Sequence, residues 1–61
     1  MSDELQQKVI EILKTERTSA PLLIAKRLKI NLIDAIRILE ALENEGKVEK
    51  KGKMFKLKLN T

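Results

Sequence analysis

The spacing of apolar residues changes at Gly46, and this change limits the folds open to the chain. Before Gly46, apolar residues recur every three or four positions in three stretches separated by breaks, which is the spacing of helices packed on a core. After Gly46, apolar and charged residues alternate around Gly52, as in a β-hairpin with one buried face. The pattern predicts an α+β fold, mainly α, with helices at about 3–15, 20–28 and 32–45 and a two-stranded hairpin at about 47–59. Because the 61 residues contain no linker or repeat, we expect one domain over 1–61.

Residue types at the expected helix ends support these limits. Ser2 can cap the first helix and Ser19 the second, because a hydroxyl can accept a hydrogen bond from a free N–H of the first turn. Asn31 can cap the third helix, and Asp34, three residues later, can return a hydrogen bond as in a capping box. Gly46 can adopt the left-handed conformation that ends a helix. The expected breaks between helices therefore carry local signals of their own.

The alternation near the C-terminus assigns each side chain to a face of the hairpin. One face is apolar and is expected in the core: Phe55, Leu57 and Leu59. Lys56 and Lys58 are expected on the solvent face of an edge strand, where Lys discourages association between sheets. Lys51-Gly52 is the expected turn, and Thr18 is expected to add a very short extended piece before the second helix.

The composition excludes most metal and nucleophile chemistry. The chain has neither Cys nor His, so it lacks thiolate and imidazole ligands. We therefore expect no enzyme activity, no metal and no cofactor, and no set of residues that would line a small-molecule site is recognisable. Charges interrupt the apolar positions of MSDELQQKVIEIL, unlike those of a signal peptide or a spanning helix. We expect an intracellular, cytoplasmic protein without a membrane segment.

The net charge of +4 is divided into blocks of alternating sign. Residues 1–16, 17–30, 31–46 and 47–61 carry −2, +4, −3 and +5 respectively. Two basic blocks thus flank an acidic one. Such blocks form a polyanion site only if the fold brings them to one surface, and they are otherwise solvated faces.

Seven positions of the second and third helices carry a resemblance to a known family. Along the chain they are an apolar residue, an alanine, a second apolar residue, a turn residue and a third apolar residue, followed by two positions of the third helix that face the core. These residues are Ile24, Ala25, Leu28, Lys29, Ile30, Ala35 and Ile38. This pattern, followed by a hairpin, resembles the winged helix-turn-helix family, in which the third helix recognises DNA and the hairpin is the wing. A small residue such as Ala25 lets the two helices cross closely. Lys29 occupies a turn position that is often Gly in this family. A Lys with a left-handed backbone there should cost about 1 kcal/mol of stability.

The resemblance implies duplex DNA as the partner and a small transcriptional regulator or architectural protein as the function. Turning by about 100° per residue places Ile33 and Arg37 on the exposed face of the third helix. Arg37 can bind guanine, whereas Ile33 offers only contact with a thymine methyl, so base discrimination should be modest. The remaining candidate residues are those expected to approach the DNA backbone from the second helix, the turn and the wing: Arg17, Thr18, Ser19, Lys26, Arg27, Lys29, Asn31, Lys50, Lys51 and Lys53.

Two other functions are compatible with the same residues. Leu32, Ile33 and Ile36 form an exposed apolar cluster on the third helix that could bind a protein partner or form a homodimer. RNA or ribosome binding is the third hypothesis, because phosphate contacts by Lys serve there as well. Convergence of the basic blocks around Arg37 would favour DNA.

Overall fold

The computed structural model describes residues 3–58. It contains three helices, α1 (Asp3–Glu16), α2 (Pro21–Leu28) and α3 (Leu32–Asn44), and three strands, β1 (Thr18–Ser19), β2 (Val48–Lys51) and β3 (Met54–Leu57). The α+β class and the three helices are confirmed, with helix ends within a residue of those expected. The expected positions of Ser2 as a cap and Leu59 as a core residue lie outside the described residues.

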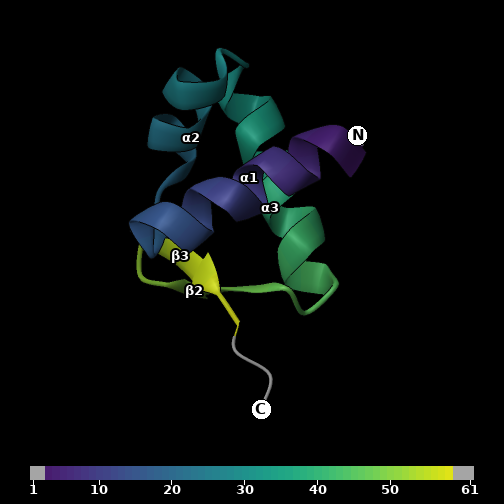
Figure 1. Cartoon of the computed structure of the whole chain (residues 1–61), viewed down its shortest axis with the longest axis vertical. Coiled ribbons are helices and arrows are strands. Elements are labelled where there is room, and N and C mark those ends of the chain that lie inside the picture. Colours follow the sequence, from purple (N-terminus) through teal and green to yellow (C-terminus); the bar gives the residue numbers. More distant parts are fainter. Residues whose placement is uncertain (1–2, 59–61) are drawn as a thin grey trace.

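The helices form one layer and the small sheet lies at its end. Figure 1 shows α1 crossing α3, with α2 beside the beginning of α3 and the β2–β3 hairpin at the opposite end of the molecule. Contacts between α1 and α3, between α2 and α3, and between α1 and β3 join these parts. The arrangement is compatible with a winged-helix fold.

The sheet has three antiparallel strands in the order β1-β3-β2. Ser19 pairs with Phe55, so β3 is the central strand, and the expectation that Lys56 lies on an edge strand was wrong. The short extended piece at Thr18 is confirmed, and it is this piece that covers the edge of β3. The turn is also shifted by one residue: Lys51 pairs with Met54, which leaves Gly52 and Lys53 as the turn instead of Lys51-Gly52. Gly52 has φ +63°, which a two-residue hairpin turn with Gly in first position requires.

A single apolar core joins all three helices to the sheet. Its buried members come from every helix and from β2 and β3: Val9, Ile12, Leu13, Ile24, Ala25, Ala35, Ile38, Leu39, Leu42, Val48 and Phe55. Ala25 and Ala35 are both buried, as close packing of α2 on α3 requires. Phe55 is buried, which confirms its expected core role. Leu22, one of the apolar residues of α2, is instead 52% exposed.

All three helices end at a residue with a left-handed backbone. Gly46 was expected to do so and has φ +77°. Its N–H donates to the Glu43 carbonyl and the Lys47 N–H to the Leu42 carbonyl, which is the hydrogen-bond pattern of a Schellman motif. Arg17 (φ 72°) follows α1 and Lys29 (φ 58°) follows α2, both with a left-handed backbone. Unlike glycine, both residues carry a Cβ that makes this conformation unfavourable.

The side-chain caps expected of Ser19 and Asn31 are not formed. Ser19 is 4% exposed and belongs to β1, so it cannot cap α2, and Ala20 occupies the N-cap position instead. Asn31 does occupy the N-cap position of α3, but its side chain makes no capping hydrogen bond. The Asn31 carbonyl accepts the first helical hydrogen bond, from the Ala35 N–H at 3.0 Å. Pairing of β1 with β3 thus takes Ser19 away from the role that its type suggested.

Candidate nucleic-acid interface

The outward face of α3 carries the residues expected there. Leu32, Ile33 and Ile36 are 44%, 62% and 36% exposed, and Arg37 is exposed beside them. The opposite side of the helix, which includes Ile38 and Leu39, is fully buried. The helical spacing therefore predicted the orientation of α3 correctly.

A hollow of about 300 Å³ separates α3 from the hairpin, and we call it the hairpin hollow. It is lined by residues of the α2 start, α3 and the hairpin: Pro21, Ile36, Glu40, Glu43, Lys50, Gly52, Lys53 and Phe55. The Lys50 ammonium lies 5.9 Å from the centre of the Phe55 ring. Lys50 and Lys53 thus approach the outward face of α3, but Glu40 and Glu43 line the same hollow and oppose them in charge.

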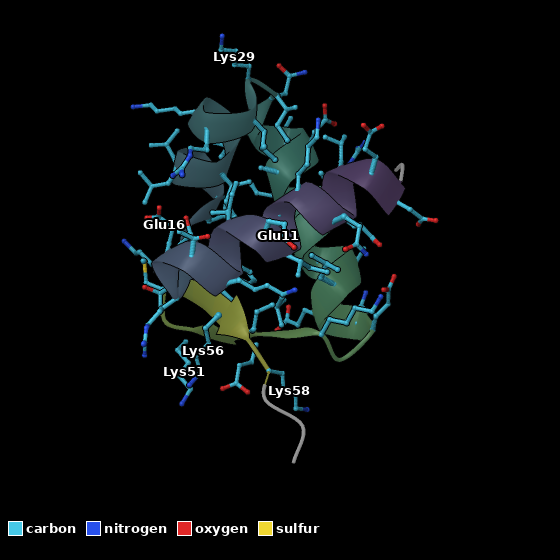
Figure 2. The ribbon with its side chains drawn as sticks, viewed as in Figure 1. Glu11, Glu16, Lys29, Lys51, Lys56 and Lys58 are labelled. Atoms are coloured by element: carbon cyan, nitrogen blue, oxygen red, sulfur yellow. The ribbon has the colours of Figure 1, made fainter. Side chains whose placement is uncertain are left out.

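The hairpin lysines are divided between the two faces of the sheet. Lys50 pairs with buried Phe55, so both share the inner face, and neighbouring strand residues point to the opposite side. On that outer side, Glu49 binds Lys51 at 3.8 Å and Lys56 at 3.6 Å. Figure 2 shows Lys51 and Lys56 together at the sheet end of the molecule. Lys51 is therefore turned away from the hairpin hollow.

Arg17 and Thr18 line a different hollow, which we call the sheet groove. It measures about 490 Å³ and lies between the end of α1 and the β1–β3 pair. The other lining residues are Leu13, Lys14, Lys56 and Leu57. Lys14 and Lys56 were not among the expected site residues. The alternation of the sequence placed Lys56 on the outer face, but only the pairing of Thr18 with Lys56 brings it beside Arg17.

Lys26 and Arg27 lie at a third hollow, between α1 and α2. It measures about 310 Å³ and is lined also by Ile12, Glu16, Ser19 and Leu23. The Arg27 guanidinium binds the Glu16 carboxylate at 3.1 Å. Both side chains are largely exposed, so this pair contributes little to stability. The pair does neutralise much of the charge that α2 was expected to offer to DNA.

Lys29 and Asn31 precede α3 and are exposed. Figure 2 shows Lys29 at the end of the long axis opposite to Lys51. The expected convergence of basic blocks is therefore partial. Lys50 and Lys53 come to α3, whereas Arg17, Thr18, Lys26, Arg27 and Lys51 lie at other hollows or on the outer face of the sheet.

Comparison of the chain with family models, with curated proteins and with solved structures gives no significant match. No helix within residues 3–58 combines the length and the apolar character needed to cross a membrane. The same residues contain no cluster of acidic side chains that could hold a metal ion.

Proposed function

We propose that the chain is a winged-helix protein that binds duplex DNA, with α3 facing the major groove and the β2–β3 hairpin as the wing. The observation that supports this most is the hairpin hollow, across which Lys50 and Lys53 approach the exposed face of α3. Arg37 on that face is exposed and has no ion pair within residues 3–58. A guanidinium in that position can donate two hydrogen bonds to guanine or bind phosphate.

The mixed charge of the hairpin hollow indicates how such binding would work. Glu40 and Glu43 would repel phosphates that enter the hollow, so the backbone contacts come from Lys50 and Lys53 at its rim and from Lys29 before α3. Ile33 contributes only apolar contact with thymine methyl groups. The proposed activity is therefore duplex binding of modest sequence preference, as in a small regulator or an architectural protein.

The test is a salt titration of duplex binding followed by fluorescence anisotropy. If Lys29, Arg37, Lys50 and Lys53 each neutralise one phosphate, log affinity should fall with log salt at a slope of about −3.6. Arg37→Gln or Lys53→Gln should each make the slope shallower by about 0.9. Glu40→Gln should change affinity in the opposite direction, because it removes a repulsive charge from the hairpin hollow.

Lys8→Gln is the matched control. Lys8 is an exposed cation of α1 that binds Glu4 at 4.0 Å and, among the described residues, lines none of the three hollows. Its removal changes the net charge as much as Arg37→Gln does, but should leave the slope unchanged. A flat salt response of the unmodified chain, or an equal loss in Lys8→Gln, would contradict the proposal.

A second candidate function is a protein-interaction module that uses the apolar cluster of Leu32, Ile33 and Ile36. Their exposure favours it, because water-exposed apolar clusters commonly mark partner sites. The occupant would be a protein partner or a second copy of the chain. Binding to RNA or to the ribosome stays a hypothesis that no feature of the structure favours over DNA.

A further inference from the structure

The sheet groove differs in charge from the other two hollows. Of its six lining residues, three are cations, Lys14, Arg17 and Lys56, and none is an acid. The hairpin hollow contains two glutamates and the α1–α2 hollow contains Glu16. The sheet groove is therefore better suited to a small anion than either of the other two hollows.

The backbone holds Arg17 at the rim of this groove. Arg17 has φ 72°, and its N–H donates to the Leu13 carbonyl at 3.0 Å, the hydrogen bond that ends α1. Its guanidinium forms no ion pair within residues 3–58. The forked N–H groups of a free guanidinium match a carboxylate or a phosphate. Arg17 can therefore bind an anion without first breaking a pair.

The two lysines of the groove have partners that a ligand can replace. Lys14 binds Glu11 at 3.5 Å and Lys56 binds Glu49 at 3.6 Å, and all four side chains are at least one-third exposed. Figure 2 shows Glu11 on α1 and Lys56 beside Lys51 at the sheet end of the molecule, so the two pairs belong to different elements. Exposed pairs of this kind are weak. The negative end of the α1 dipole, about half a charge, does not cancel three cations.

The floor of the groove is apolar. Leu57 is half-buried and leaves apolar surface open to the groove, whereas Leu13 is 1% exposed and closes the groove toward the core. A phosphodiester backbone offers this surface only its sugar carbons, which lie between charged phosphates, whereas a small amphiphile can place a continuous alkyl chain on it. The volume of about 490 Å³ is in the range of small-molecule sites.

We propose that the sheet groove binds a small amphiphilic anion, with its carboxylate or phosphate head on Arg17 and Lys56 and a short apolar body on Leu57 and the methylene stem of Lys14. The Thr18 hydroxyl is a further donor at the head-group end. This site is separate from the duplex surface proposed above and does not depend on it. In a DNA-binding protein, it would be an effector site.

The test is an NMR titration of the full chain with hexanoate, hexyl phosphate, inorganic phosphate and hexan-1-ol. Both amphiphilic anions should shift the backbone amides of Arg17, Thr18, Lys56 and Leu57, and the tighter of the two identifies the preferred head group. Inorganic phosphate lacks the apolar body and hexan-1-ol lacks the charge, so each should bind at least about tenfold more weakly. The proposal would be overturned if hexan-1-ol bound as tightly as hexanoate, or if the amide shifts were confined to other parts of the chain.

Variants separate this site from a general effect of charge. Arg17→Gln and Lys56→Gln should each weaken hexanoate binding by about fivefold, the scale of an exposed charge pair. Lys8→Gln removes an α1 cation outside the groove and should leave hexanoate binding unchanged. The two groove variants should also keep the salt slope of duplex binding. A loss of duplex binding in both of them would instead show the groove to be a nucleic-acid surface and would overturn the assignment to a small anion.

Discussion

Lys29 ends α2 with a backbone that favours glycine, so replacing it should stabilise the protein. Its φ and ψ are 58° and 45°, and the N–H groups of Lys29 and Ile30 both donate to the Ala25 carbonyl. A left-handed residue with a Cβ costs about 1–2 kcal/mol. Glycine avoids this cost but loses about 0.5–1 kcal/mol more conformational entropy on folding. Lys29→Gly should therefore raise the free energy of unfolding by about 0.5–1 kcal/mol, and the Tm by about 2–8 °C in a domain of this size.

Two further variants, measured by urea unfolding with circular dichroism, isolate the backbone contribution. Lys29→Ala removes the same charged side chain but keeps the Cβ, so it should gain nothing. Gly46→Ala should lose about 0.5–1.5 kcal/mol, because Gly46 has φ +77° and the strain is only partly offset by unfolded-state entropy. A Cβ at Gly46 would meet no heavy atom within 4 Å, so no steric clash contributes to this loss. The reasoning fails if Lys29→Gly is no more stable than Lys29→Ala, or if Gly46→Ala unfolds like the unmodified chain.

Two other variants test the core and the apolar cluster of α3. Leu39 is fully buried, so Leu39→Ala should cost about 2–5 kcal/mol of the roughly 3–9 kcal/mol expected for 61 residues. Thermal unfolding followed by circular dichroism should show the Tm lowered by at least about 8 °C. Retention of a cooperative transition near the original Tm would argue against this core. Ile33→Ser combined with Ile36→Ser should change the unfolding free energy by less than about 1 kcal/mol, because both side chains are exposed. If the cluster binds a second copy, sedimentation should show that the dimer of the unmodified chain is lost in this variant. The salt slope of duplex binding should be retained. A sedimentation coefficient equal to that of the unmodified chain would exclude a homodimer through this cluster.

The helices were predictable because their signals are local. Spacing of three and four residues assigns Val9 and Leu13 to one face of α1, and the same rule turned Ile33 and Arg37 outward on α3. The pairing of β1 with β3 has no such signal. It joins Ser19 to Phe55 across most of the chain, and a two-residue strand has no periodicity to detect. Ser19 was therefore assigned to a helix cap, the role that its neighbours in sequence favour.

The candidate sites depend on the same long-range pairing. Alternation from Val48 already separates Lys50 from Lys51, but the position of Lys50 directly opposite Phe55 follows only from the register. Likewise, the sheet groove exists because Thr18 lies opposite Lys56. Net charge per segment could not locate either surface, since the basic block at 47–61 is divided between the two faces of one hairpin.

The two proposed sites share one element within the described part of the chain, the strand β3. Phe55 lines the hairpin hollow, and the next two residues, Lys56 and Leu57, line the sheet groove. This strand and the hairpin turn at Gly52 are therefore the most direct route for an influence of a bound anion on duplex binding. Such an influence is reciprocal: an anion that weakens duplex affinity by a given factor must itself be released by duplex to the same extent. Because β3 is held by a partner strand on each side, we expect it to move little, and the two sites should bind almost independently.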